Sequence, residues 1–327
     1  MPREMVSTTP EAADGQTVPG PSVPGPSVTA PSRVIHGDNL AVIATLPGES
    51  FRLIYLDPPF NTGRTQQRQN IRTVRNADGA RKGFQGQSYE TVKGTLTQYD
   101  DRFADYWGFL EPRLIEAWRL LDDRGTLYLH LDYREAHYAK VALDALFGRD
   151  SFLNEIIWAY DYGARATKKW PSKHDTILVY VKNPRTYYFD NLAVDREPYM
   201  APGLVTPEKV ERGKLPTDVW WHTIVSPNGR EKTGYATQKP EGIVRRIIQA
   251  SSAPGDWVLD FFAGSGTTGA VAQALDRRFL LVDENPDAIA IMRARLGEAA
   301  VFSRHAEAAP SPSAPPAQTP SPGTMTP

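Results

Sequence analysis

Short apolar runs alternate with amphipathic segments along the middle of the chain. β-Branched and aromatic runs bounded by turn residues predict strands at 34–36, 51–56, 126–131, 257–262 and 279–282. Apolar residues spaced three or four positions apart predict helices at 41–46, 106–121, 134–146, 240–250, 267–275 and 286–296. Strands that alternate with helices require right-handed crossovers. The sequence therefore predicts an α/β fold with a doubly wound, mainly parallel sheet.

Other segments lack this alternation. Residues 1–31 and 304–327 are rich in Pro, Ser and Thr and show no hydrophobic periodicity, so we expect disordered tails. Residues 61–100 are polar, basic and glycine-containing, which predicts a long functional or mobile loop. Short strand-like runs occur at 156–158 and 177–181, and residues 190–235 are irregular.

The composition excludes several classes of protein. The chain has 327 residues, 40% of them hydrophobic, which is ordinary for a soluble globular protein. It has no cysteine, so it forms no disulfide and fits the reducing cytoplasm, where we expect it. No apolar run approaches the roughly 20 residues that a membrane span needs, and we find no signal-peptide pattern. The six histidines lack metal-ligand spacing, so we expect no metal site.

Basic residues cluster in two places, although the net charge is only −1. Runs of charge usually form solvated faces. Cations beside aromatic rings suit nucleic acid, however, because phosphate pairing and base stacking act together. The second cluster lies next to Tyr160, Tyr162 and Trp170. The first cluster consists of Arg64, Arg68, Arg72, Arg75, Arg81 and Lys82, and the second of Arg165, Lys168, Lys169 and Lys173.

An acid, two prolines and an aromatic residue follow the strand predicted at 51–56. Proline donates no hydrogen bond to a sheet and fixes its own φ, so Asp57-Pro58-Pro59-Phe60 makes a stiff strand end. Asp57 precedes a proline and is therefore biased toward extended geometry. This strand end presents a carboxylate, carbonyl groups without a local N–H donor, and a flat ring. Such a set suits the binding of a planar ring that carries an amine.

The turn after the fourth predicted strand is rich in glycine. Gly264, Gly266 and Gly269 match the spacing G-x-G-x-x-G, and Asp283 ends the next strand about 20 residues on, where an acid can bind ribose hydroxyls. Two nucleotide-like ligands compete: a dinucleotide with its pyrophosphate on the helix N-terminus, and S-adenosylmethionine, which has no phosphate. Asp260 favours the second, because an acid repels pyrophosphate but attracts an ammonium or sulfonium group.

Four segments together resemble one family. Asp-Pro-Pro-Phe at 57–60 resembles the catalytic motif of amino-group DNA methyltransferases, which methylate the exocyclic nitrogen of adenine or cytosine. Residues 260–268 resemble the cofactor motif of this family. Residues 37–40 resemble the motif near the cofactor's adenine, and residues 237–240 the motif at its methionine end. The catalytic motif at 57–60 precedes the cofactor motif at 260–268. This order is similar to the β-type arrangement of the family, in which a target-recognition region separates the catalytic motif from the cofactor motif.

The resemblance implies a site-specific enzyme that uses S-adenosylmethionine to methylate double-stranded DNA by base flipping. It implies a Rossmann-like methyltransferase fold with a catalytic half at 32–159, a target-recognition region at 160–233 and a cofactor-binding half at 234–303. Both basic clusters would bind DNA. The catalytic residues would be Asp57, Pro58, Pro59 and Phe60, and the cofactor-binding residues Asp38, Gln238, Lys239, Asp260, Phe261, Phe262, Ala263, Gly264, Ser265, Gly266, Thr267, Thr268 and Asp283. Whether Asp283 or Glu284 meets the ribose is open.

In this hypothesis Phe60 stacks on the extruded base, while Asp57 and the Pro58 carbonyl accept the two amine hydrogens. An Asp in this motif favours N6 of adenine, and N4 of cytosine is the alternative within the family. An NAD-dependent oxidoreductase would leave residues 57–60 and the basic clusters unexplained. The intact motifs also argue against a non-catalytic DNA-binding module. The sequence leaves open whether the protein forms a homodimer and whether a restriction endonuclease partner accompanies it.

Overall fold

The computed structural model describes residues 30–61, 64–75, 81–82, 88–101, 105–163, 165–226 and 228–305. The tails predicted at 1–31 and 304–327 therefore lie outside the described residues, except at their inner ends. No helix within these ranges is long and apolar enough to cross a membrane.

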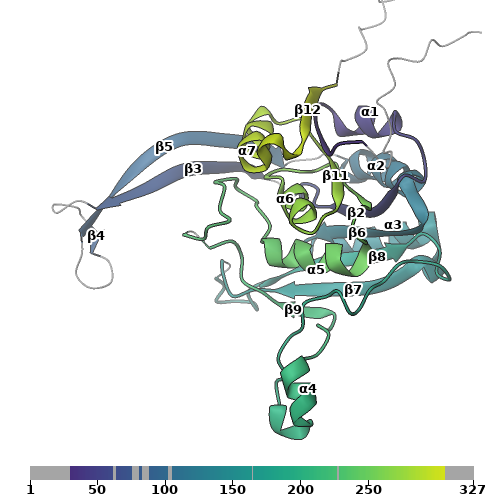
Figure 1. Cartoon of the computed structure of the whole chain (residues 1–327). Helices are drawn as coiled ribbons and strands as arrows, with labels where there is room; N and C mark the ends of the chain where they lie inside the picture. Colours follow the sequence, from purple (N-terminus) through teal and green to yellow (C-terminus); the bar gives the residue numbers. More distant parts are fainter. Residues whose placement is uncertain are drawn as a thin grey trace, which may run out of the picture.

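A nine-stranded sheet forms the centre of the fold (Figure 1). Neighbouring strands run parallel from β12 to β6 and again between β7 and β9, whereas β8 runs antiparallel to both of its neighbours. The prediction of a mainly parallel α/β sheet is confirmed. The strand order is β12 (Val301–Arg304), β1 (Arg33–His36), β11 (Arg278–Asp283), β10 (Trp257–Asp260), β2 (Phe51–Leu56), β6 (Leu121–Leu131), β8 (His174–Val181), β7 (Phe152–Ala159) and β9 (Val219–Trp221).

Helices cover both faces of this sheet. Successive residues of a strand point to opposite faces, so Ile35 packs in one core and its neighbour Val34 in the other. One core contains residues of α1 (Asn39–Ala44), α2 (Tyr106–Leu120) and α3 (Ala136–Phe147). The other contains residues of α5 (Glu241–Ser251), α6 (Thr267–Ala274) and α7 (Pro286–Leu296). The hydrophobic spacing predicts all six helices, and each predicted end lies within two residues of the observed end.

The range predicted for target recognition shares the central sheet. Both β8 and β9 fall within residues 160–233, and β8 pairs directly with β6 of the catalytic half. The remaining described parts of this range are irregular, apart from the one-turn helix Pro202–Leu204 and α4 (Pro207–Arg212). Figure 1 shows α4 at the lower end of the molecule, away from the sheet.

Residues 61–100 contain long strands, so the prediction of a loop here was wrong. β3 (Arg64–Arg75) pairs antiparallel with β5 (Ser88–Asp101), and β5 also pairs with β4 (Arg81–Lys82). Figure 1 shows this β-arm extending away from the body of the molecule. Tyr or Thr occupies most alternate positions of β5, a composition that favours strands. The segment lacks the apolar alternation that would have revealed a half-buried strand.

The strand order creates a crevice at one edge of the sheet. β10 and β2 are neighbours, but after β10 the chain continues to β11 on one side, and after β2 it continues to β6 on the other. Such a reversal leaves a crevice at the carboxyl ends of the strands, where α/β proteins bind ligands. The motif at 57–60 directly follows β2, and the motif at 260–268 begins at the last residue of β10. The two motifs therefore meet at this crevice.

Candidate active site

The acid–proline corner, residues Asp57 to Phe60, directly follows β2. Pro58 and Pro59 have no backbone N–H, so neither residue donates a hydrogen bond to the carbonyl groups of the corner. Asn61 anchors the far end of the corner, because its Nδ2 donates to Glu135 Oε1 at 3.0 Å. The corner thus holds the Asp57 carboxylate and the Phe60 ring next to each other at the carboxyl edge of the sheet.

Lys239 makes an ion pair with Asp57. Its Nζ lies 2.7 Å from Oδ1 and 2.6 Å from Oδ2 of the carboxylate. The same nitrogen lies 4.7 Å from the centroid of the Phe60 ring. Lys239 comes from the segment just before α5, 182 positions away in the sequence. The structure therefore joins the 237–240 motif to the acid–proline corner, a contact that the sequence does not reveal.

Hydrogen bonds to two acids shape the glycine turn. Asp260 Oδ2 accepts from the Thr268 hydroxyl at 2.6 Å, and its Oδ1 accepts from the Phe262 N–H at 3.0 Å. Asp283 Oδ2 accepts from the Gly264 N–H at 2.7 Å. The pKa of Asp260 is raised to about 7, mainly by burial and also by the charges of Asp57 and Asp283, although the hydrogen bonds from Thr268 and Phe262 oppose this shift. Burial also raises the pKa of Asp283.

Two glycines are required for steric reasons. Gly264 has φ +50°, and a Cβ there would lie 2.9 Å from the ring of Tyr235. Gly266 has φ +71°, and a Cβ there would lie 2.6 Å from Met292 Cγ. Side chains rarely adopt such φ values, and both contacts are too short for carbon atoms. The turn can therefore pack closely against its neighbours only with glycine at these positions.

A polar cluster closes the other side of the crevice. Asn39 Nδ2 donates to the Phe261 carbonyl at 2.9 Å, and Arg113 Nε donates to Asn39 Oδ1 at 2.6 Å. Arg113 Nη2 also contacts Asp38 Oδ2 at 3.3 Å, while Asp38 Oδ1 caps α1 by accepting from the Ala41 N–H. Arg113 was not found from the sequence, because a single Arg within an amphipathic helix carries no recognisable signal. It links α2 to the 37–40 motif, and Asn39 links this motif to the glycine turn.

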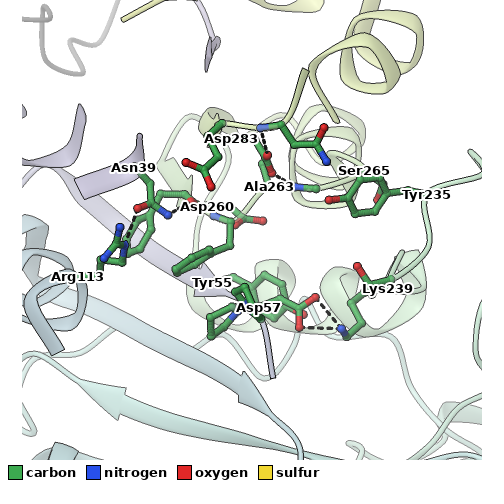
Figure 2. A pocket seen from close by; sticks show the side chains of 18 of the residues that line it. Asn39, Tyr55, Asp57, Arg113, Tyr235, Lys239, Asp260, Ala263, Ser265 and Asp283 are labelled. Carbon is green, nitrogen blue, oxygen red and sulfur yellow. Dashed lines mark hydrogen bonds and ion pairs between the residues drawn. The ribbon is translucent and has the colours of Figure 1, made fainter. Parts of the chain in front are cut away.

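These parts line one cavity of about 460 Å³ (Figure 2). Figure 2 shows Asp57 and Lys239 facing each other on one side, with Asn39 and Arg113 on the other. Of the predicted residues, the cavity is lined by Asp38, Asp57, Pro58, Pro59, Phe60, Lys239, Asp260, Phe261, Phe262, Ala263, Gly264, Ser265 and Asp283. The catalytic and cofactor motifs therefore meet in one space, as the resemblance requires.

Four of the residues predicted to bind the cofactor do not line this cavity. Gly266, Thr267 and Thr268 support the turn from behind. Thr267, for example, contacts Ser265 and the Lys239 carbonyl through its hydroxyl. The amide of Gln238 bonds instead with Thr233 and the Glu231 carbonyl. Tyr235, Arg113 and Glu284 also line the cavity, and of these three only Glu284 had a role predicted from the sequence, as the alternative to Asp283.

The lining of the cavity fits a cationic nucleoside better than a pyrophosphate. Five carboxylates line it, from Asp38, Asp57, Asp260, Asp283 and Glu284. The cations among its described lining residues are Arg113 and Lys239, and each already pairs with a carboxylate. A pyrophosphate would meet net repulsion here, whereas the sulfonium and ammonium groups of S-adenosylmethionine would be attracted.

A buried chain of hydrogen bonds lies beside the corner. Tyr55 OH lies 2.8 Å from His130 Nδ1, and His130 Nε2 lies 3.2 Å from Asp175 Oδ2. Tyr160 OH donates to Asp175 Oδ1 at 3.0 Å. The ring of His130 lies 6.0 Å from the ring of Phe60, centroid to centroid. His130 is fully buried with both ring nitrogens engaged, so it serves as a structural histidine that supports the corner.

The second basic cluster lies next to the acid–proline corner. Arg165, Lys168 and Lys169 are exposed on the segment between β7 and β8. A second cavity, of about 360 Å³, shares Phe60 with the first and is also lined by Arg165 and Lys169. Trp170, on the same segment, is 94% exposed. The first cluster, Arg64 to Lys82, falls on the β-arm, and its side chains lie outside the described part of the structure.

Comparisons with known proteins agree with this geometry. A family model described as DNA methylase matches residues 51–294, which is more than half of the chain. The chain belongs to the DNA methylase family. The sequence-based resemblance is thus confirmed, and with it S-adenosylmethionine as the cofactor of the family.

Individual relatives fit the same family. The chain is 32% identical to DNA adenine methyltransferase YhdJ of Escherichia coli (strain K12), over 83% of this chain and 84% of the relative. It is 29% identical to type II methyltransferase M.HpaI of Haemophilus parainfluenzae, over 81% and 74%. Among solved structures, PvuII DNA methyltransferase (cytosine-N4-specific) matches with a TM-score of 0.56 and 15% identity, over 82% and 86%. This last likeness confirms the methyltransferase fold.

Proposed function

We propose that this DNA methylase transfers a methyl group from S-adenosylmethionine to the N6 amine of adenine in double-stranded DNA. One observation carries the proposal: the acid–proline corner and the glycine turn open into the same cavity. Asp at position 57 favours adenine over cytosine. The adenine specificity of the relative YhdJ, at 32% identity, supports the same choice. The N4-cytosine enzyme shares the fold at only 15% identity, so it carries less weight.

The residues around the glycine turn would hold the cofactor. Asp283 or Glu284 would accept hydrogen bonds from the ribose hydroxyls, and Asp38 and Asn39 would lie toward the adenine end. The carboxylates of the cavity would attract the positive charges of the ligand. When bound, the cofactor supplies an electrophilic methyl group on a positively charged sulfur. The sulfur is the leaving group and becomes a neutral thioether.

The acid–proline corner would hold and activate the amine. The lone pair of an aromatic amine is delocalised into its ring, so the amine is a weak nucleophile. In our proposal Asp57 and the Pro58 carbonyl accept one amine hydrogen each, which localises the lone pair on nitrogen. Phe60 stacks on the ring and fixes its plane, so that the amine faces the methyl group. One amine proton is finally lost to Asp57 or to water when the new N–C bond has formed.

The base must leave the DNA stack to reach this corner, at a cost of a few kcal/mol. The exposed cations Arg165 and Lys169 lie beside Phe60 and would hold phosphates next to the extruded nucleotide. We propose that the β-arm contributes further DNA contacts. The segments of residues 160–233 that lie outside β8 and β9 would contribute the other contacts, and together these parts would provide the sequence specificity. A homodimer and a restriction endonuclease partner stay predictions.

The target base can be identified directly. DNA that the purified protein has methylated with S-adenosylmethionine is digested to nucleosides and analysed by mass spectrometry. N6-methyldeoxyadenosine is the expected product. N4-methyldeoxycytidine would transfer the same mechanism to cytosine, because both bases present an NH2 group beside a ring nitrogen. Sequencing of the modified positions would then give the recognition site.

A further inference from the structure

Lys239 occupies the space that the mechanism assigns to the target amine. Its Nζ lies within 2.7 Å of both oxygens of Asp57 and 4.7 Å from the centroid of the Phe60 ring. The side chain of Lys239 is only 11% exposed, so the ammonium is held inside the site. We call the space between the Asp57 carboxylate and the Phe60 ring the amine position.

We propose that Lys239 fills the amine position in the free enzyme and that the charge of the cofactor displaces it, so that the target base binds more tightly with a cationic cofactor than with a neutral one. The inference rests on methyl transfer at Asp57, as set out above, and it applies to either target base. It makes Lys239 a positioning residue that decides when the corner can accept a base.

The ammonium and the target amine cannot share this position. Both are nitrogen donors that require the Asp57 carboxylate, and Lys239 already contacts both of its oxygens. A base stacked on Phe60 would also cover the ring face over which Nζ lies. Lys239 must therefore withdraw from at least one oxygen and from the ring before the base can bind.

A second anionic group is available to the displaced ammonium. Lys239 lines the cofactor cavity and also a neighbouring cavity of about 500 Å³, which contains Asp175 and Tyr160. Although burial raises it, the pKa of Asp175 is held below its ordinary value by His130 and by the positive charge of Lys239. A lysine side chain has a flexible chain of four carbons and can redirect its charge without backbone movement. Lys239 can thus move from Asp57 toward Asp175.

The charge of the cofactor supplies the reason for this movement. Methyl transfer requires the positively charged sulfur to approach the amine position closely, and an ammonium already there would repel it. The cofactor product is a neutral thioether and causes no such repulsion. Lys239 would then return to Asp57 and compete with the methylated base. The same lysine thereby favours binding of the unmethylated base before transfer and release of the product afterwards.

The test measures base extrusion rather than turnover. A duplex containing the methylation site carries the fluorescent base 2-aminopurine next to the target base, so that the target base itself keeps its amine. The fluorescence of 2-aminopurine rises when the target base leaves the stack. The duplex is titrated with enzyme in the presence of sinefungin, a cationic cofactor analogue, or of neutral S-adenosylhomocysteine. We expect extrusion by the wild type to require about tenfold less enzyme with sinefungin than with S-adenosylhomocysteine.

Variants assign this difference to one residue. Lys239→Met should reduce the ratio to about one, mainly because extrusion with S-adenosylhomocysteine becomes easier. Lys239→Arg keeps the charge and should keep a preference for sinefungin. The matched control is Lys140→Met, because Lys140 pairs with Asp144 at 2.7 and 2.6 Å and lies 4.0 Å from the Phe152 ring, but lines neither the cofactor cavity nor the two cavities that share Phe60 or Lys239 with it. This control should behave as the wild type.

A Lys239→Met protein that keeps the wild-type ratio would overturn the proposal. Equal extrusion by the wild type with both ligands, or no extrusion with either, would also overturn it. These outcomes are independent of the proposed function, because methyl transfer from S-adenosylmethionine is measured separately. Extrusion that depends on cofactor charge but leads to no methylated base would contradict the proposed function and leave the role of Lys239 intact.

Discussion

Asp283 Oδ2 accepts a hydrogen bond of 2.7 Å from the backbone N–H of Gly264. Its other oxygen, Oδ1, accepts from the Asn285 N–H at 2.9 Å. One carboxylate at the end of β11 thus fixes the turn after β10 and the start of α7 together. Glu284, the next residue, lines the same cavity but is exposed. The two adjacent acids therefore have different structural roles.

Removal of the Asp283 carboxylate should affect both stability and cofactor binding. Asp283→Ala leaves two backbone N–H groups without their acceptors, which should destabilise the protein by about 1–3 kcal/mol and weaken binding of S-adenosylmethionine. Urea unfolding measures the first effect and calorimetric titration the second. Glu284→Ala is the matched control and should leave stability unchanged. If Glu284→Ala weakens cofactor binding more than Asp283→Ala, Glu284 is the residue that meets the ribose.

The buried carboxyl of Asp260 should make stability depend on pH. Its pKa is about 7 in the folded protein, against an ordinary value of 3.8. Between these values the folded state binds more protons than the unfolded state, so this group lowers stability as the pH rises from about 4 to 7. Asp260→Asn removes the titration and nearly keeps the shape of the side chain. The stability of the wild type relative to Asp260→Asn should fall over this range, on the order of a few kcal/mol.

Unfolding in urea at several pH values between 5 and 7.5 measures this difference. The comparison with Asp260→Asn is needed because other carboxyl groups, including Asp283, also titrate differently in the folded protein. A constant difference between the two proteins across the range would show that Asp260 titrates normally, and would contradict the effect of burial described above.

Lys169 and Trp170 should contribute to DNA binding in different ways. Lys169→Ala removes one phosphate contact, so the slope of log Kd against log salt should decrease by about 0.9. Trp170 is exposed among cations and would stack on a base. Trp170→Ala should weaken binding by about 1–3 kcal/mol without change in the salt slope. Fluorescence anisotropy with a labelled duplex at several salt concentrations separates these effects, and unchanged affinity in both variants would remove this segment from the DNA interface.

Much of the fold follows from local patterns in the sequence. The apolar runs at 51–56 and 279–282 correspond closely to β2 and β11, because buried parallel strands are apolar on both faces. The motifs after β2 and β10 mark the functional edge because proline and glycine impose local geometry that does not depend on distant residues. The cavity could therefore be predicted in outline, with both Asp57 and Gly264 in its lining.

Features that depend on distant pairing could not be predicted. The antiparallel direction of β8 depends on its partners β6 and β7, and the β-arm depends on pairing between two polar strands. The ion pair between Lys239 and Asp57 joins residues 182 positions apart. The resemblance assigned Lys239 to the cofactor, and the structure shows that its ammonium also contacts the Asp57 carboxylate. Only the folded arrangement reveals such contacts.

The central claim is that Asp57 activates an amine that faces the cofactor in one shared cavity. Purified wild type, Asp57→Ala and Asp57→Asn proteins are incubated with tritiated S-adenosylmethionine and unmethylated DNA, and binding of the cofactor is measured in parallel. We expect Asp57→Ala to lose roughly 10²–10⁴-fold in methyl transfer while it still binds S-adenosylmethionine, and Asp57→Asn to retain more activity through its remaining acceptor oxygen. Methyl transfer by Asp57→Ala at the wild-type rate would contradict this mechanism.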